Sequence, residues 1–361
     1  MRFSQNKTII LSGQDVQKIV QHHGIDAVME ALISRMWKAF RKFDPLNTII
    51  PKRSGFNYQN PESGLIEWMP LHGKGEKVII KVVGYHPNNP EKYNLPTILS
   101  TLSAYDTATG HLLGLMDGVL LTALRTGAAS AIASMLLANP DSTTLGLIGC
   151  GAQSVTQLHG LSCKYDFDRV LIYDVDDVAL ASFEDRCAAL QLHVEIVPAS
   201  IEEIVARADI LCTATSVEVG KGPLFSGLRT KPWLHINAVG ADFPGKVELP
   251  LNLLENSFVC PDFREQAIVE GECQQLDHSK IGPDLVEVAQ NKEAYAHVQN
   301  QCTVFDSTGW ALEDQVVMEL FLEYASSLGL GQEIEIEFMP EDAKSPYHFI
   351  NAISMVERKD L

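Results

Sequence analysis

The chain has 361 residues and a formal net charge of −18 at pH 7, and 46% of its residues are hydrophobic. A chain of this length favours two domains, or one large domain, with an ample core. The acidic balance argues against a nucleic-acid-binding protein, which would normally present a basic face.

Cysteine usage and apolar patterning predict a cytoplasmic protein without a membrane span. The seven cysteines are an odd number and include no CxxC pair, which is typical of a reduced chain. Residues 1–10 lack the apolar core and cleavage site of a signal peptide. The apolar window over residues 112–138 is interrupted by Asp117 and Arg125, so it predicts a buried helix. The histidines form no HExxH or similar pattern, so no metal is predicted.

In chain order, the first third of the sequence predicts a helical segment followed by antiparallel strands. Residues 14–43 have the apolar spacing of an amphipathic helix with a break near Gly24, and a loop rich in Pro, Asn and Gly follows. Strand patterns then recur with short turns between them, which is typical of an antiparallel meander. They cover residues 64–71, 77–85, 96–106 and 111–118.

After Leu121 the pattern changes to alternating strands and helices. A helix over residues 122–138 leads into an apolar strand, a glycine turn and another helix, and a helix over 313–331 precedes a polar end. This alternation predicts a doubly wound parallel sheet, so we expect an α/β fold. The predicted strands cover residues 145–149, 169–175, 194–198, 209–216, 233–240, 257–262 and 303–309.

The glycine turn in LGLIGCGAQSV has the pattern of a dinucleotide-binding site. Gly149 and Gly151 lie where a strand meets a helix, so the backbone can approach a pyrophosphate and the helix N-terminus can hold it. The sixth position is Ser154 rather than Gly or Ala, so the match is partial. Asp174 ends the next strand, where an acid can accept hydrogen bonds from both ribose hydroxyls and favours NAD over NADP. The alternative is a glycine turn of another α/β protein with Asp174 as a helix cap.

Four charged residues interrupt or follow apolar segments, as a catalytic site requires. Glu67 and Lys81 lie within strand patterns, where they could also face solvent. Arg125 lies in the apolar helix and could instead pair with Asp117. Asp242 follows the strand LHINAVG and could instead cap a turn. Taken together, two cations suit a substrate carboxylate, and two acids near a nicotinamide suit the ammonium group of an amino acid.

Several motifs, spread in order over residues 60–330, make the sequence resemble the ornithine cyclodeaminase and μ-crystallin family. They are KVVGYHP, DGVLLTALRTGAASAIAS, GLIGCGAQS, INAVGADFPGKVEL, GECQQL and VFDSTGWALED. EWMP, KVVGYHPNNP and LPTIL are most similar to the ornithine and lysine cyclodeaminase branch. The resemblance implies a small-molecule diamino acid as substrate and a tightly held NAD that takes a hydride and later returns it. It implies ring closure with release of ammonia, giving proline or pipecolate.

The resemblance also implies a division into two domains and a homodimer. Residues 1–129 and 318–361 would form an α+β domain that binds substrate and dimerises, and residues 130–317 would form a Rossmann domain that binds NAD. The site would lie in the cleft between them. We therefore expect a homodimer with no nucleic-acid partner and no membrane.

The family's functional residues carry over to numbered positions in this chain. Lys81 and Arg125 match the residues that bind the substrate carboxylate, Arg53 is a further candidate, Glu67 matches the acid facing the amino groups, and Asp242 matches the acid–base aspartate. The catalytic set is therefore Asp242, Glu67 and Lys81. The implied cofactor-binding residues are Thr126, Gly149, Gly151, Ala152, Gln153, Ser154, Asp174, Thr213, Asn237, Val239 and Ser307.

Two other functions remain open on the same fold. A cyclic ketimine reductase or an opine-type amino-acid dehydrogenase would share the cofactor site, but it would consume one cofactor per turnover. A non-enzymatic NAD-dependent binding protein would not need Asp242 at all.

Overall fold

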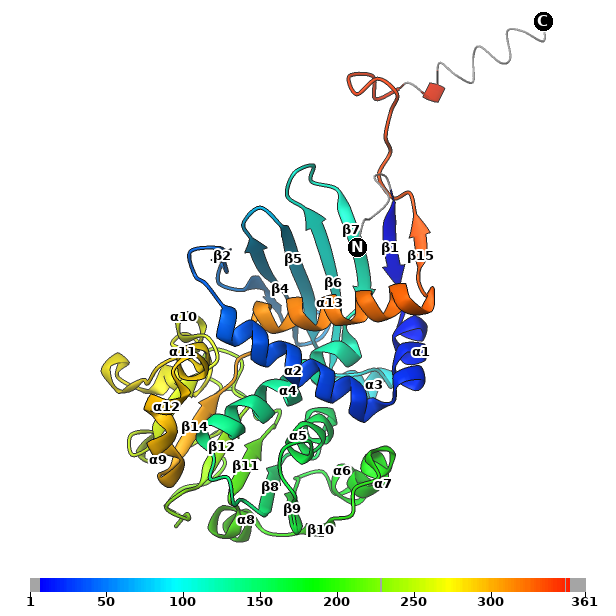
Figure 1. Ribbon diagram of the computed structural model, residues 1–361. Helices are drawn as coiled ribbons and strands as arrows, with labels where there is room; N and C mark the ends of the chain where they lie inside the picture. The colour runs from blue at the N-terminus through cyan, green and yellow to red at the C-terminus, as the bar shows by residue number, and fades with distance from the viewer. Residues whose placement is uncertain (1–6, 228, 348, 351–361) are drawn as a thin grey trace, which may run out of the picture.

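The structure is a computed structural model that describes residues 7–227, 229–347 and 349–350. Within these residues the strands form two sheets, one mixed and one parallel (Figure 1). The predicted lack of a signal peptide concerns residues 1–10, of which 1–6 lie outside the described residues. The end of the first predicted domain, residues 351–361, lies outside them as well.

The mixed sheet contains the predicted meander and four strands that were not predicted. In the described chain its strands run in the order β15-β1-β7-β6-β5-β4-β2, and β3 pairs with β4. Strands β4 to β7 are antiparallel, so the predicted meander is confirmed, and the unpredicted strand β1 adds a parallel pairing with β7 at its edge. The bounds are β1 (Thr8–Leu11), β2 (Thr48–Ile49), β3 (Ser54–Tyr58), β4 (Gly64–Gly73), β5 (Lys77–Tyr85), β6 (Ile98–Asp106), β7 (Leu112–Asp117) and β15 (Gln332–Ile334).

Helices α1 (Gly13–His23), α2 (Ile25–Lys42) and α13 (Ala311–Leu328) lie across one face of the mixed sheet (Figure 1). The predicted break falls at Gly24, whose φ of 83° suits glycine and ends α1. A capping box between Ser12 and Asp15 begins α1. The buried residues of α2 recur every three or four positions and form the stripe that faces the core.

Helix α4 (Val119–Leu137) lies at the centre of the molecule and joins the two sheets. It packs against β6 of the mixed sheet and against β12 and β14 of the parallel sheet. It is the one described helix long and apolar enough to cross a membrane, but 78% of its apolar window is buried inside the fold. The prediction of a buried core helix is therefore confirmed.

The parallel sheet has the order β10-β9-β8-β11-β12-β14-β13 in the described chain, and all its pairings are parallel. The order reverses between β8 and β11, and doubly wound sheets bind ligands at the carboxyl ends of the strands at such a point. The prediction of a doubly wound parallel sheet with a second α+β part is confirmed. The bounds are β8 (Thr144–Ile148), β9 (Arg169–Tyr173), β10 (Glu195–Pro198), β11 (Ile210–Thr213), β12 (His235–Ala238), β13 (Phe258–Pro261) and β14 (Thr303–Asp306).

The remaining helices are short and mostly surround the parallel sheet. They are α3 (Asn89–Tyr93), α5 (Ala152–Ser162), α6 (Asp177–Ala181), α7 (Phe183–Cys187), α8 (Ile201–Arg207), α9 (Leu251–Leu254), α10 (Arg264–Ala267), α11 (Leu285–Gln290) and α12 (Lys292–Tyr295), with 3₁₀ turns η1 (Ala188–Leu190), η2 (Glu272–Gln275), η3 (His278–Lys280) and η4 (Ala296–Asn300). The predicted domain borders near residues 130 and 317 fall inside α4 and α13, and the division stays a prediction.

Candidate functional site

The glycine turn between β8 and α5 has the geometry that a pyrophosphate requires. Gly149 has a φ of 96°, and a Cβ atom there would lie 2.5 Å from the backbone oxygen of Ala214, so only glycine fits. Gly151 is the N-cap of α5 and makes no side-chain cap bond, which leaves the first amides of the helix available to an anion. Ala152 is exposed and Gln153 half-buried beside it.

Ser154, the departure from the dinucleotide fingerprint, is compatible with this turn. Its side chain is buried, and its hydroxyl donates a hydrogen bond to the backbone oxygen of Gly149. The serine therefore closes the turn on itself and does not project toward the place where a pyrophosphate would lie.

Asp174 lies directly beside the glycine turn. Its Oδ2 accepts a hydrogen bond from the Cys150 amide at 2.5 Å, and its Oδ1 accepts one from the Asp176 amide at 2.9 Å. The cap of α6 is Asp176, which accepts hydrogen bonds from the amides of Val178 and Ala179. Asp174 is therefore not the helix cap that the alternative interpretation required, and it is free to face a ribose.

Three of the other predicted cofactor residues, on β11, β12 and α4, have side chains that bond within the fold. Thr213 donates to Glu248 at 2.6 Å, and Asn237 donates to the Ser134 hydroxyl at 3.0 Å. Thr126 donates back to the oxygen of Thr122 within α4.

Ser307 and Val239 differ from these residues, because they follow β14 and β12 directly. Their amides donate to Ala238 and Thr213 on neighbouring strands. The Ser307 hydroxyl is buried and has no hydrogen-bond partner among the described residues. A buried polar atom without a partner is costly, so this atom suits a polar ligand at the edge of the sheet. The free amides of α5, the carboxylate of Asp174 and this hydroxyl fit a dinucleotide.

Lys81 and Arg125 meet at a shared carboxylate in the interior. Lys81 lies on the face of β5 that is turned toward α13, beside Met69 and Leu102 in register, and its side chain is 1% exposed. Its Nζ is 2.9 Å from Oδ1 of Asp314, and the Arg125 Nε is 3.4 Å from the same oxygen. The solvent-facing alternative for Lys81 is thus wrong for this chain.

Arg125 binds a second acid of the same helix turn. Its Nη1 donates to Glu313 at 2.7 Å, so the partners of Arg125 are Glu313 and Asp314 rather than Asp117. Burial lowers the pKa of Lys81 to about 8; the charge of Arg125 acts in the same direction, and Asp314 opposes both. Two cations held this close by two acids form a rigid, partly compensated group.

Arg53 bridges the mixed sheet to the parallel sheet. Its Nη1 is 3.4 Å from Glu67 of β4, its Nε is 2.6 Å from Glu270, and its Nη2 donates to the backbone oxygen of Thr308. Glu67, like Lys81, lies on the inner face of the mixed sheet, two residues before buried Met69. Arg53, Glu67 and Glu270 therefore converge from three distant segments.

Asp242 lies next to this group and is the most accessible of its acids. Its side chain is 35% exposed, and its Oδ1 is 3.1 Å from Nζ of Lys246. The Lys246 Nζ lies 5.5 Å from the ring centre of Tyr85, at the end of β5. Within the described residues no hydrogen bond or ion pair joins Asp242 to Lys81 or Arg125. Its charge nevertheless acts on Glu270.

Glu270 is an acid that sequence reasoning did not single out. Burial raises its pKa to about 8; Arg53 opposes this shift, while the charges of Glu67 and Asp242 add to it. Glu270 immediately precedes the glycine of the motif GECQQL, but a lone acid before a glycine carries no signal of burial. The acids Glu313 and Asp314 were also missed, because acids in the first turn of a helix have an ordinary explanation in the helix dipole.

The charged cluster thus combines cations and acids from both sheets. Its acids outnumber its cations by two when all are ionised. The cations are Arg53, Lys81, Arg125 and Lys246, and the acids are Glu67, Asp242, Asp262, Glu270, Glu313 and Asp314. Such an excess suits a ligand with more ammonium than carboxylate groups.

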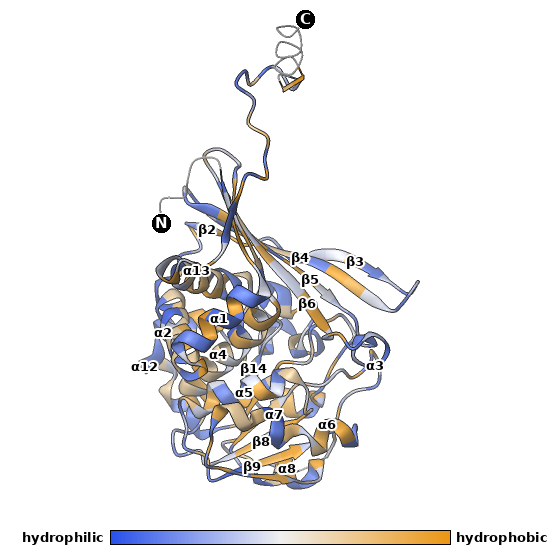
Figure 2. Ribbon diagram, turned by 90° about the vertical axis from the view of Figure 1, so that its right-hand side faces the viewer, coloured by the Kyte–Doolittle hydropathy of each residue, from blue (hydrophilic) through white to orange (hydrophobic). Residues whose placement is uncertain are grey.

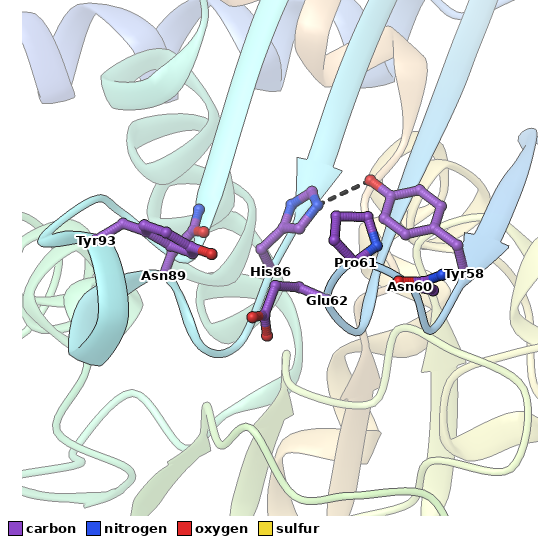
Figure 3. A pocket seen from close by; sticks show the side chains of 7 residues that line it. All are labelled: Tyr58, Asn60, Pro61, Glu62, His86, Asn89 and Tyr93. Atoms are coloured by element: carbon purple, nitrogen blue, oxygen red, sulfur yellow. Dashed lines mark hydrogen bonds between the residues drawn. The ribbon is translucent and has the colours of Figure 1, made fainter.

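A separate hollow of about 480 Å³ opens beside the β3–β4 turn, and it contains no residue of the charged cluster. Tyr58 and Tyr93 stand on either side of His86, and the Tyr58 hydroxyl is 2.8 Å from the His86 ring (Figure 3). The described lining also includes Asn60, Pro61, Glu62 and Asn89.

Comparison with known proteins gives matches over nearly the whole chain. The model of the ornithine cyclodeaminase/mu-crystallin family matches residues 14–328. The L-lysine cyclodeaminase of Streptomyces rapamycinicus is 42% identical over 342 residues, which are 94% of this chain and 99% of that protein.

Solved structures also match over more than nine-tenths of the chain. A lysine cyclodeaminase, studied for its recognition of L-lysine, L-ornithine and L-2,4-diaminobutyric acid, matches with a TM-score of 0.91 and 47% identity over 95% of this chain and 99% of that chain. An archaeal alanine dehydrogenase dimer with bound NAD matches with a TM-score of 0.81 and 30% identity over 92% of this chain and 100% of that chain.

Proposed function

Because the chain belongs to the ornithine cyclodeaminase/mu-crystallin family, we propose that it converts an L-diamino acid into a cyclic amino acid with release of ammonia. L-lysine would give L-pipecolate, and L-ornithine would give L-proline. The observation that carries the proposal is the charged cluster, in which Lys81 and Arg125 share Asp314. In the same cluster Arg53 joins Glu67 to Glu270, and the charge of Asp242 acts on Glu270.

The cofactor of the reaction is NAD, which when bound supplies reversible hydride transfer at the substrate α-carbon. The amides at the start of α5 would hold its pyrophosphate, and Asp174 would accept hydrogen bonds from its ribose. The buried hydroxyl of Ser307 gains a partner in this arrangement.

Lys81 and Arg125 would bind the substrate α-carboxylate. Asp314 uses one of the three Nζ donors of Lys81, so donors remain for a ligand. Both side chains are buried and held by α13, and their positions are therefore set before substrate arrives. Fixed donors lose little entropy on binding, which favours a well-oriented carboxylate.

The acids of the charged cluster would bind the substrate's ammonium groups and exchange protons with them. A diamino acid carries two ammonium groups and one carboxylate, and a cluster with more acids than cations complements that net positive charge. Glu270 keeps its proton near neutral pH because burial raises its pKa to about 8, so it can donate a proton. Asp242 is more exposed and would exchange protons with the reacting amine and with solvent.

The outer face of the mixed sheet supports a homodimer. Phe56, Ile66, Trp68, Val82 and Leu99 are exposed apolar residues that share this face by strand register. Strands β3 and β4 extend beyond the rest of the sheet (Figure 2). An apolar face of this kind is typical of a subunit interface, so the dimer would form through it. The cytoplasmic location is a separate proposal, which the cysteine usage supports.

The direct test is product stoichiometry. The purified protein is incubated with L-lysine or L-ornithine and an amount of NAD far below that of substrate, and ammonia and the ring product are measured. Many molecules of ammonia per NAD, with no accumulation of NADH, are expected. The Asp242→Asn variant should lose turnover by ~10²–10⁴-fold while NAD binding is retained.

The second candidate is a reductase or dehydrogenase on the same fold. The similarity to an archaeal alanine dehydrogenase favours it. It would consume or produce one NADH per turnover and would release no ring product from a diamino acid. One-for-one cofactor use in the stoichiometry experiment would replace the cyclodeaminase proposal with this one.

A further inference from the structure

Two loops that carry acids of the charged cluster are joined by the amide of Gln274. One loop, residues 239–249, follows β12 and carries Asp242; the other turn carries Glu270 and runs into η2. The Gln274 Oε1 accepts a hydrogen bond from the Gly245 amide at 2.6 Å. Its Nε2 donates to the backbone oxygens of Gly271 at 2.7 Å and Lys246 at 3.0 Å, with Phe243 at 3.4 Å.

The 3₁₀ turn η2, which carries Gln274, is held by hydrogen bonds to the parallel sheet. The amides of Glu272 and Cys273 donate to the two carboxylate oxygens of Asp306, at 2.8 and 2.7 Å. The Glu272 carboxylate in turn accepts hydrogen bonds from the amides of Glu248 and Leu249. Because Asp306 ends β14, η2 is fixed relative to the carboxyl edge of the sheet.

The ends of the Asp242 loop are fixed as well, but its middle is not held in the same way. At one end, Glu248 accepts a hydrogen bond from the Gly240 amide at 3.0 Å. For the middle, residues 243–246, the described hydrogen bonds from outside the loop are those of Gln274 and one long bond from the Gly220 amide to the Gly245 oxygen at 3.4 Å. Val219 also lies close to Gly245, and Lys246 packs on Tyr85. Gln274 therefore supplies most of the hydrogen bonds that hold this part.

We propose that Gln274 is a positioning residue that sets Asp242 relative to Glu270 for the reaction. The inference rests on the proposed function, and Gln274 itself would not touch the substrate. One amide binds the backbone next to Glu270, at Gly271, and the backbone next to Asp242, at Phe243 to Lys246. A displacement of about 1 Å in a group that acts on substrate can cost about 10²-fold in rate.

The chain offers a matched control in the neighbouring residue. Gln275 lies on the same turn, and its amide donates to the Leu249 oxygen at 3.1 Å and to Glu272 at 2.7 Å. It makes no bond to residues 243–246 in the described structure. Gln274→Met and Gln275→Met remove the same chemical group from adjacent positions, so they separate positioning of the loop from support of η2.

The test measures kcat, KM, the pH–rate profile and hydrogen–deuterium exchange of residues 243–246, the middle of the loop, which Gln275 does not bond in the described structure. Gln274→Met should lower kcat by ~10–100-fold, change the pH–rate profile, leave KM and NAD affinity within about twofold, and speed exchange in this loop. Gln274→Glu keeps the acceptor for Gly245 but sets a carboxylate oxygen against the carbonyl oxygens of Gly271 and Lys246, so it should lower kcat at least as much. Gln275→Met should stay near the parent in all four measurements.

Equal losses of kcat in the two methionine variants would reduce Gln274 to a structural residue and overturn the proposal. Unchanged exchange in Gln274→Met would overturn it too, whatever the activity. If the parent itself releases no ammonia from any diamino acid, the proposed function fails separately, and the exchange measurement still decides whether Gln274 holds the loop. Should Gln274→Met fail to fold, Gln274→Glu carries the same comparison.

Discussion

Lys81 and Asp314 are 233 residues apart in the sequence, yet their charged atoms lie 2.9 Å apart in the interior, and each side chain is 1% exposed. The pair joins β5 to the first turn of α13, and Asp314 also contacts Arg125. The group that would bind a substrate carboxylate is therefore also a structural link between the second strand of the meander and the last long helix.

Asp314→Asn should be strongly destabilising. It leaves the buried charge of Lys81 without its partner, and such a loss typically costs about 3–5 kcal/mol in the free energy of unfolding. Urea denaturation measures it. A matched control joins the same two elements at the surface, because Lys77 of β5 pairs with Glu319 of α13 at 2.8 Å. Glu319→Gln should cost about 0–1 kcal/mol. Equal costs would show that burial of the inner pair has no energetic consequence.

The free energy of unfolding should carry a pH dependence that comes from Glu270. Burial raises its pKa to about 8 in the folded protein, against an ordinary value of 4.5. Between these values the unfolded chain has released the proton and the folded protein retains it, so this group's contribution to stability falls as the pH rises. Glu270→Gln cannot release a proton, so the variant should gain on the parent steadily from pH 5 to pH 8. Parallel curves for the two proteins in urea titrations would contradict this assignment.

Asp174→Asn should weaken NAD binding and reduce the preference for NAD over NADP. Hydrogen bonds to a charged group contribute about 1.5–3 kcal/mol, so the Kd for NAD should rise by ~10–100-fold. Fluorescence titration with both cofactors measures it. Asp176→Asn makes the same charge change two residues away, and asparagine can still cap α6 there, so its Kd should stay within about twofold of the parent. A similar rise in the Kd for NAD in both variants would show that the effect comes from the loss of a negative charge and not from a hydrogen bond between Asp174 and the ribose.

Trp68→Asp should convert the proposed dimer to a monomer. The substitution places a charge in the centre of the exposed apolar face formed by Phe56, Ile66 and Val82. Sedimentation equilibrium at micromolar concentration measures the change. Val175→Asp is the control, because Val175 is an exposed apolar residue in the loop after β9, away from the mixed sheet. If the parent protein sediments as a monomer, the proposed dimer is contradicted.

The sequence predicted strands well where they form an alternating pattern or follow one another as apolar runs between helices. The alternating pattern of β4 to β7 and the apolar runs of the parallel sheet are strong signals, and the structure has strands at all of them. Strands β1, β2, β3 and β15 have two to five residues and belong to neither pattern, so they were not predicted. The parallel pairing of β1 with β7 is a long-range contact that no local pattern records.

The site shows the same division between local and long-range information. The glycine turn and Asp174 are local features, and they lie together as expected. Glu270, Glu313 and Asp314 were missed because burial, not residue type, makes them unusual, and burial depends on segments far away in sequence. Lys81 and Arg125, which were singled out by their charge within apolar segments and then by family resemblance, are brought together. Asp242 is paired with Lys246, and its charge acts on Glu270.

The position of α13 has a consequence for the order in which the protein can assemble during synthesis. The meander and Lys81 leave the ribosome early, but their covering helix and the acid that neutralises Lys81 are encoded after the whole parallel sheet. Nascent chains shorter than about residue 314 must therefore carry an uncompensated lysine or keep it in water. The mixed sheet and its covering helix are completed only after residues 311–334 have been synthesised.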